Sequence, residues 1–187
     1  MVRENLSKFL LVSIIFNLIL GATLVKKTEE FNRQTELTLY NYCRDTYYVY
    51  SDLDSKLFKN GSDVLNNSEY INNALSEAAD RLITVKENII SLNIKDKRIT
   101  KVIEEDKLSS TSLYILYLNR KLDKEKKLEE KDISNLKQII DKGKLFGTYA
   151  ESGPNYNKKF NPEHPLTKIA NLYGELDQIY QTTLVTK

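Results

Sequence analysis

The side chains most often used for catalysis and metal binding are scarce in this 187-residue chain. His164 is the only histidine, and it lies between Pro162 and Pro165. A multi-histidine metal site therefore cannot form, and a histidine in a loop framed by prolines is poorly placed for a Ser-His-Asp triad. Cys43 is the only cysteine, which excludes an internal disulfide and a thiolate metal cluster. The sequence predicts no metal site and no cofactor.

Two other arrangements look like parts of catalytic motifs but lack the remaining parts. Ser134 and Lys137 have the S-x-x-K spacing of penicillin-interacting enzymes, but no S-D-N or K-T-G sequence follows. Carboxylates are abundant, for instance at Glu104 and Glu105, but adjacent helical residues point in different directions and cannot face each other across a cleft. We therefore expect no catalytic residue and no enzymatic activity.

The charges of the chain nearly cancel. Lys and Arg number 28 and Asp and Glu 26, which gives a formal net charge of +2. No block of one sign is long enough to follow a phosphate backbone. This balance argues against nucleic acid as a partner.

Tyrosine is the residue type that stands out, with twelve in the chain and a cluster of them between residues 40 and 50. On a helix the clustered tyrosines cover more than one face, so they cannot all be buried. Tyrosine combines an apolar ring with a polar tip and is enriched at protein interfaces. Packing at the edge of a core is the competing interpretation. The candidates for contact with a partner protein are Tyr47, Tyr48 and Tyr50.

Residues 9–25 form an uncharged, mainly apolar run (FLLVSIIFNLILGATLV). As an α-helix this run would be about 25 Å long, and Lys8 can reach past its end toward the surface of a hydrocarbon core of about 30 Å. Only Ser13, Asn17 and Thr23 interrupt it, so it lacks the polar stripe of a soluble helix. We predict a transmembrane anchor in contact with membrane lipid. A cleaved signal peptide is the competing interpretation, but the run is long for one and lacks a good A-x-A cleavage site.

The orientation of the anchor is not decided by the positive-inside count, because basic residues stand on both sides of it. A very short basic leader is typical of an anchor that keeps its N-terminus in the cytoplasm. We therefore expect residues 1–8 to be a cytoplasmic tail, and residues 26–187 to be an extracytoplasmic domain of a single-pass protein of the cell membrane.

The rest of the chain carries the signals of helices. All three prolines lie at or after residue 154, and neither glycine nor proline occurs between Ser62 and Lys142, which a β-rich fold with tight turns could hardly tolerate. Apolar residues recur at helical spacing. The strongest stripe comprises Ile71, Leu75, Ala78, Leu82, Val85, Ile89 and Leu92. Weaker stripes comprise Leu39, Tyr42, Thr46, Val49 and Leu53; Leu113, Leu116 and Tyr117; Ile133, Leu136 and Ile140; and Leu166, Ile169, Tyr173, Leu176 and Tyr180.

These stripes predict an all-α fold, an N-terminal transmembrane helix followed by an antiparallel bundle of four or five helices. The expected helices of the domain cover residues 26–60, 62–93, 96–127, 132–150 and 162–185. Nothing breaks the chain between the anchor and the first of them, so the two can form one rod. The fourth is expected to fray around Gly143 and Gly147. The stripe on the second also fits a coiled-coil dimer, but matching stripes on several helices favour a bundle within one chain.

Two segments resemble the YpeB family of bacterial spore-germination proteins. Residues 41–44 (NYCR) leading to residues 52–57 (DLDSKL) are similar to the first ectodomain helix of that family, and residues 128–136 (LEEKDISNL) to its acidic helix start. The short basic start, single anchor and following helices are also similar, over about residues 1–150. The resemblance implies a role in germination beside a cortex-lytic hydrolase. That family continues into repeated small α+β modules, whereas this sequence ends at Lys187.

The sequence thus predicts a non-enzymatic, membrane-anchored helical domain that binds a partner protein in the bacterial cell envelope, in the setting of sporulation or germination. The alternative is a helical bundle that senses a ligand and signals through a membrane partner. Self-association as a dimer stays open beside the intrachain bundle.

Overall fold

The computed structural model describes residues 2–59, 62–91, 107–150 and 163–184, without the side chains of residues 2–9, 11, 62–63, 91, 107–110, 163–165 and 183–184. The described helices are α1 (Val2–Asp54), α2 (Ser68–Ser91), α4 (Lys107–Glu125), α5 (Glu130–Lys144), α6 (Gly147–Ala150) and α7 (Glu163–Leu184). A π-helical turn, η1 (Ser55–Lys59), and a 3-10 turn, η2 (Ser62–Asn66), join α1 to α2. These ranges contain no strand, and the predicted all-α fold class is confirmed.

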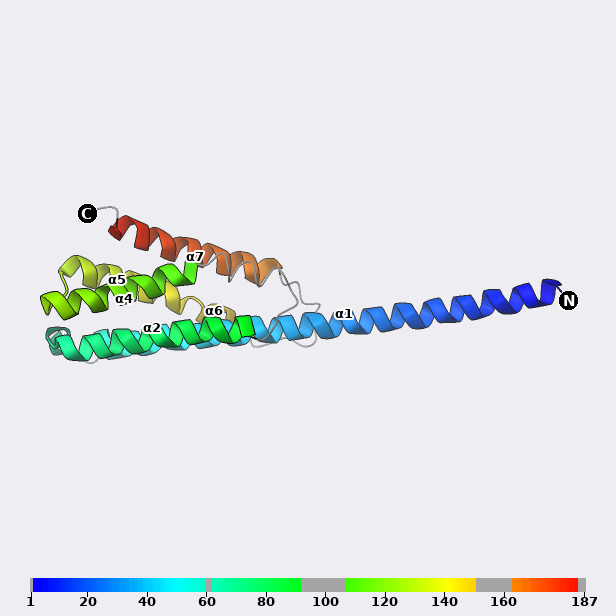
Figure 1. Ribbon diagram of the computed structural model, residues 1–187, viewed down its shortest axis with the longest axis horizontal. Coiled ribbons are helices and arrows are strands. Elements are labelled where there is room, and N and C mark those ends of the chain that lie inside the picture. Colours follow the sequence, from blue (N-terminus) through cyan, green and yellow to red (C-terminus); the bar gives the residue numbers. More distant parts are fainter. Residues whose placement is uncertain (1, 60–61, 92–106, 151–162, 185–187) are drawn as a thin grey trace.

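Helix α1 is the longest element, with 53 residues and a length of about 80 Å. Its N-terminal half projects alone from the other helices, and its C-terminal half forms part of the bundle (Figure 1). In the part of the chain that the structure describes, no helix is both long enough and apolar enough to cross a membrane.

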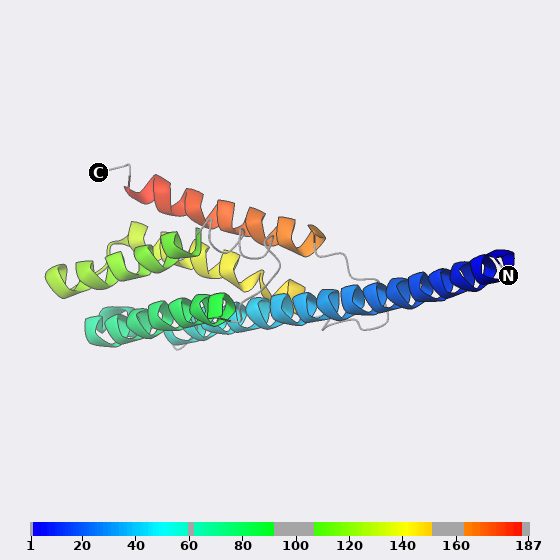
Figure 2. The same ribbon diagram turned by 45° about the vertical axis from the view of Figure 1, so that its right-hand side comes forward.

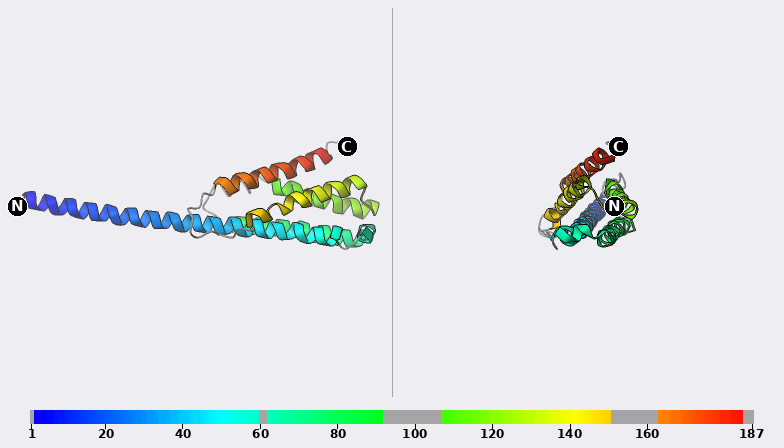
Figure 3. Two further views of the ribbon diagram at one scale, coloured as in Figure 1. Left: turned by 180° about the vertical axis from the view of Figure 1, so that it is seen from behind. Right: turned by 90° about the vertical axis from the view of Figure 1, so that its left-hand side faces the viewer.

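The bundle has three layers. Helices α1 and α2 lie side by side in the first layer, α5 packs on α1 and α4 packs on α2 in the second, and α7 lies across α4 and α5 as the third (Figures 1 and 2). Successive long helices run in opposite directions, as the predicted up-down bundle requires (Figure 1). The buried apolar side chains of these helices form one core cluster, and Figure 3 shows the bundle from behind and along its length.

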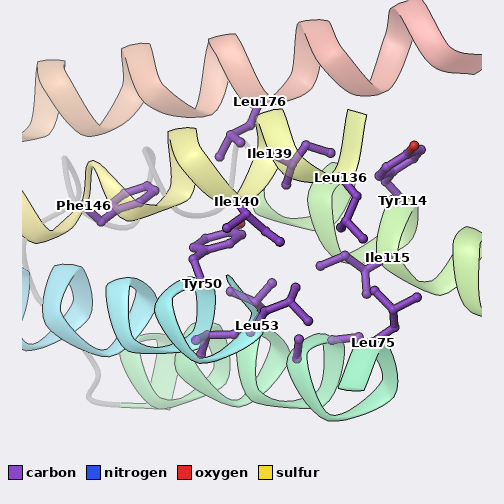
Figure 4. Close-up of a cluster of buried hydrophobic side chains, with 14 of the residues drawn as sticks. Tyr50, Leu53, Leu75, Tyr114, Ile115, Leu136, Ile139, Ile140, Phe146 and Leu176 are labelled. Atoms are coloured by element: carbon purple, nitrogen blue, oxygen red, sulfur yellow. The ribbon is translucent and has the colours of Figure 1, made fainter. Parts of the chain in front are cut away.

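The core between the layers is built from the predicted apolar stripes. On α1 the stripe Leu39, Tyr42, Thr46, Val49 and Leu53 is buried, as are Leu166, Ile169, Tyr173 and Leu176 on α7. The stripe on α2 is buried from Ile71 to Ile89, with Val85 half-buried, and Leu92 lies outside the described residues. Tyr50 and Leu53 of α1, Leu75 of α2 and Ile140 of α5 converge at the centre (Figure 4).

Helix α4 differs from its predicted stripe. Leu113 is 52% exposed, and Leu116 and Tyr117 are only half-buried, whereas Tyr114, Ile115, Leu118 and Leu122 are buried. The buried residues Ile115, Leu118 and Leu122 still have three-four spacing, so α4 has one buried stripe at other positions than the predicted one. This stripe packs in the middle layer, where α4 contacts α2 and α7.

Several helix boundaries also differ from the predicted ones. The range 26–60 belongs to α1 and η1, with residue 60 outside the described residues. The range 62–93 divides into η2 and α2, with residues 92–93 outside the described residues. Of the range 96–127, residues 96–106 lie outside the described residues, and α4 covers 107–125. The range 132–150 divides into α5 and α6, and α7 covers nearly all of 162–185.

Capping explains two of the helix starts. The Tyr70 N–H donates to Asn67 Oδ1 at 3.0 Å, so Asn67 caps α2. The Glu129 N–H donates to Asp132 Oδ2 at 3.1 Å, so Asp132 caps α5 from inside its first turn, and the helix begins before it.

Candidate functional site

The three tyrosines predicted as partner contacts lie in three different environments. Tyr48 is 54% exposed, Tyr47 is half-buried and Tyr50 is 1% exposed. Two residues along an α-helix turn the side chain by about 200°, so Tyr48 and Tyr50 point to nearly opposite sides of α1. The prediction of Tyr50 as a contact is wrong, because the side chain packs in the core.

Two glycines leave space for the rings of Tyr47 and Tyr50, the two tyrosines of the three that are not fully accessible. A Cβ added at Gly143 of α5 would overlap the ring of Tyr50, and one added at Gly147 of α6 would lie 2.7 Å from Cδ2 of Tyr47. Gly143 is thus a packing residue in the last turn of α5, and the helix ends at Lys144, between the two glycines where fraying was expected. The clustered tyrosines and the two glycines can both be seen in the sequence. They are far apart in the chain, however, and no spacing pattern shows that they contact each other.

The accessible side chains of the bundle part of α1 form what we term the outer face of α1, defined as Leu37, Tyr40, Arg44 and Tyr48. Leu37 is 42% exposed, and the Arg44 side chain is 41% exposed. The Arg44 guanidinium lies 5.8 Å from the centre of the Tyr40 ring and bonds Asp45 Oδ1 at 2.9 Å. Tyrosine and arginine are the side chains that most often carry binding energy at protein interfaces.

A buried carboxylate joins the end of α1 to α5. Asp54, whose side chain is 2% exposed, accepts hydrogen bonds from Lys137 Nζ at 2.7 Å and Lys144 Nζ at 2.8 Å, and Lys59 Nζ lies 3.6 Å away. Burial alone would raise the pKa of Asp54, but the two lysine hydrogen bonds outweigh it and hold the pKa at about 2. The cluster fixes the end of α1, where the π-helical turn η1 begins, against α5.

A second buried ion pair joins α4 to the start of α5. Lys121 is 7% exposed, and its Nζ donates to Asp132 Oδ2 at 2.7 Å and lies 3.3 Å from Glu129 Oε2. Burial would lower the pKa of Lys121, but the hydrogen bond and charge of Asp132 reverse this and raise it above its ordinary value. Both buried lysine–carboxylate contacts thus have a structural role, because each closes a junction between helices.

An exposed ion network joins α1 and η1 to α2. Arg81 Nη1 lies 2.9 Å from Asp52 Oδ2, and Lys56 Nζ lies 2.6 Å from Glu77 Oε2. The four side chains are 28–52% exposed, so each pair contributes little free energy of folding.

The residues that resembled catalytic groups have other partners or surroundings. Lys137, half of the S-x-x-K spacing, is bonded to Asp54 and to Asp141, the latter at 3.0 Å. Burial raises the pKa of the Cys43 thiol to about 12, so the nucleophilic thiolate is not available at neutral pH. His164 lies in the first turn of α7 rather than in a loop, and its side chain is outside the described part. Among the described residues, no three His, Cys, Asp or Glu side chains are grouped to bind a metal ion.

The described residues therefore combine a bundle fixed by ion pairs, an outer face suited to contact with a protein, and a projecting apolar half of α1. Comparison of the chain with protein-family models, with curated proteins and with solved structures found no match.

Proposed function

We propose that this protein is a single-pass membrane protein whose extracytoplasmic bundle binds a partner protein of the bacterial cell envelope through the outer face of α1. The observation that carries the proposal is the accessible apolar surface of the projecting half of α1. One unbroken helix would link this membrane-bound half to the bundle.

The projecting half of α1 has large apolar side chains around its whole circumference. Their exposed fractions lie between 44% and 68% for Leu10, Val12, Ile14, Ile15, Phe16, Leu18, Ile19, Leu20, Leu24 and Val25. Continuous apolar surfaces of this extent are rare on proteins in water and indicate contact with lipid or protein. The proposed span is residues 9–25, which include Phe9 and Leu11, whose side chains the structure does not describe.

The outer face of α1 supports the partner-binding part of the proposal. It places Tyr48, Arg44 and Leu37 on the side of α1 opposite to the buried stripe, on the same helix as the proposed anchor. The face begins about 18 Å beyond the end of the proposed span, at Leu37, and extends to about 35 Å, at Tyr48, so a membrane partner would contact it with an extracytoplasmic part of its own chain. The setting in the envelope and in germination rests on the resemblance to the YpeB family.

A topology measurement tests the anchor and its orientation. Cys43 is replaced by Ser, Lys187 is replaced by Cys, and intact cells are treated with a membrane-impermeant maleimide beside lysed and denatured controls. We expect labelling in intact cells. Labelling only after lysis would place the bundle in the cytoplasm and contradict the proposal.

Site-specific photocrosslinking tests the binding face. A photoreactive phenylalanine analogue at Tyr48 is expected to give a discrete crosslinked protein in intact cells. The matched control is the same analogue at Tyr70, an exposed tyrosine of α2 with an accessible fraction of 37%. Equal products from both positions, or none from Tyr48, would contradict binding through the outer face.

A second candidate function is a ligand-sensing bundle that signals through a membrane partner. The unbroken α1 favours it, since a displacement in the bundle would be carried along one helix to the membrane. The two functions differ in one measurement. Sensing requires that a ligand change the accessibility of cysteines placed in residues 26–34, whereas partner binding alone does not.

A further inference from the structure

Helices α2 and α4 are antiparallel neighbours (Figure 1). Two hydrogen bonds between side chains fix their register, from Asn72 Nδ2 to Asp123 Oδ1 and from Asn119 Nδ2 to Ser76 Oγ. Ile83 lies two turns after Ser76 on α2, and Leu113 lies nearly two turns before Asn119 on α4. Ile83 and Leu113 are therefore level with each other along the bundle.

These two apolar side chains are accessible. Ile83 is 37% exposed and Leu113 is 52% exposed. Ile90, one heptad after Ile83 on the same side of α2, is 47% exposed. Accessible apolar side chains that are grouped on neighbouring helices, rather than scattered singly, indicate an interaction surface.

The charges around this apolar patch have opposite signs on the two helices. Among the described side chains, the exposed charged residues within about 60° of Ile83 around α2 are acidic, and those within about 60° of Leu113 around α4 are basic. They are Glu69, Asp80 and Glu87 on α2, and Arg120 and Lys124 on α4. None of the five forms an ion pair within the described residues. We term these five residues, together with Ile83 and Leu113, the α2–α4 face.

The α2–α4 face is complementary to a second copy of itself. A two-fold axis parallel to the helices brings α2 of one copy against α4 of the other and keeps every residue at its own level. Ile83 then faces Leu113 of the second copy. By the same register, Glu69 and Lys124 of the second copy are about 3 Å apart along the axis, so opposite charges meet beside the apolar contact.

The size of the α2–α4 face fits a weak but specific dimer. Asp80 and Arg120 occupy levels between the two contacts just described, so the charge complementarity continues along the face. With α4 about 28 Å long and two helices about 20 Å wide, the face covers roughly 600 Å² per copy. Specific interfaces begin at about this area.

We propose that the α2–α4 face is the contact surface of a symmetric dimer of this chain. In this dimer both projecting halves of α1 point the same way, as two anchors in one membrane require. The proposal goes beyond the proposed function and does not depend on it, because the outer face of α1 is not part of the contact.

Cysteine crosslinking of the full-length protein in detergent micelles tests the geometry. Cys43 is replaced by Ser, and two differently tagged chains, one with Ile83→Cys and one with Leu113→Cys, are mixed and oxidised. We expect a disulfide-linked dimer that carries both tags. The matched control replaces Ile83→Cys by Thr84→Cys, which lies about 100° further around α2 and should give at least about 5-fold less of that dimer. Equal yields, or no linked dimer, would overturn the proposal.

Charge reversal tests the same contact by sedimentation equilibrium. Glu69→Lys and Lys124→Glu each place like charges at both symmetric contacts, so each variant alone is expected to dimerise about 10-fold more weakly than the wild type. An equimolar mixture of the two variants should regain most of the wild-type affinity, because each new charge then meets its opposite in the other chain. Dimerisation that the single variants leave unchanged, a mixture as weak as the single variants, or a wild type that stays monomeric would each contradict the symmetric dimer.

Discussion

Helix α1 consists of two halves that differ in where their apolar side chains lie. In the projecting half, apolar residues such as Ile15, Phe16 and Leu18 occur on every side, and all are exposed. In the bundle half they are confined mainly to one face. The side chains of that face between Leu39 and Leu53 are at most a few per cent exposed. One continuous helix thus has a surface suited to a uniformly apolar medium and a surface suited to a core on one side and water on the other.

This difference shows that the distribution of apolar residues around a helix, rather than their number, indicates its surroundings. The bundle half also carries the polar junctions at Asp54 and the ion network at Asp52. Within the apolar run of the projecting half, the Thr23 hydroxyl is turned back onto the carbonyl of Ile19, and no charged residue occurs between residues 9 and 25. Four substitutions test this contrast, from the largest expected effect to the smallest.

The double variant Ile15→Arg/Ile19→Arg introduces two charges into the projecting half. Each arginine near the centre of a membrane helix costs about 2.5–3.5 kcal/mol, so we expect the protein to leave the membrane fraction after an alkaline carbonate wash. The matched control is Tyr48→Arg in the bundle half, which should leave the membrane fraction unchanged. Full retention of the double variant would contradict the proposed membrane anchor.

Gly143→Ala tests the packing of the bundle half. The added Cβ would overlap the Tyr50 ring, and we expect the free energy of unfolding to fall by about 3 kcal/mol in chemical denaturation. Tyr50→Leu in the same background should restore part of the loss by removing the ring. A stable single variant would mean that α1 and α5 are further apart than described.

Asp54→Asn tests the buried junction. With a pKa of about 2 in the folded state and about 3.9 when unfolded, Asp54 stabilises the fold at neutral pH, and this contribution is lost as the pH falls from about 4 to 2. We expect the variant to lose about 2 kcal/mol at pH 7 and to show a shallower acid dependence in unfolding curves between pH 6 and 2.5. Asp45→Asn, at a carboxylate whose side chain is 44% exposed, is the control and should change little. Parallel acid curves for wild type and Asp54→Asn would contradict the assigned pKa.

Gly21→Ala should have the smallest effect. A Cβ at this glycine meets no atom within 4 Å, so the substitution creates no overlap, and alanine favours the helix. We expect the midpoint of thermal unfolding of the bundle to stay the same. A loss comparable to that of Gly143→Ala would show that the projecting half packs against something, and would reverse the contrast between the two halves.

The sequence predicted most of the fold because four of its apolar stripes have helical spacing and bury most of the residues expected, with Val85, Ile133 and Tyr180 half-buried. It misplaced the stripe of α4, because residues 113–118 (LYILYL) are all apolar and their order does not show which of them face the core, so Leu113 was taken for a core residue. Of the three predicted contact tyrosines, Tyr50 was wrong because the shape of its surroundings depends on Gly143, which is distant in the chain.

The buried ion pairs were beyond prediction for a similar reason. Asp54, Lys137 and Lys144 look like ordinary charges of solvated helices, and their pairing depends on how α5 packs on α1. The sequence around one of these residues does not show which residue of another helix it will contact. The apolar spacing that predicts a helix, in contrast, is visible within the helix itself.

The position of Asp54 has a consequence for how the chain folds during its synthesis. Its two closest lysine partners lie 83 and 90 residues further along the chain. Helices α1 and α2 are neighbours in sequence and can pair early, but of the three lysines around Asp54 only Lys59 is close to it in the chain, and the two that donate hydrogen bonds to it emerge much later. The first layer must therefore wait, with a hydrated carboxylate and an open apolar face, for more than half of the remaining chain to arrive. An export route that keeps the chain unfolded, or a chaperone that covers this face, would protect the protein from aggregation during that interval.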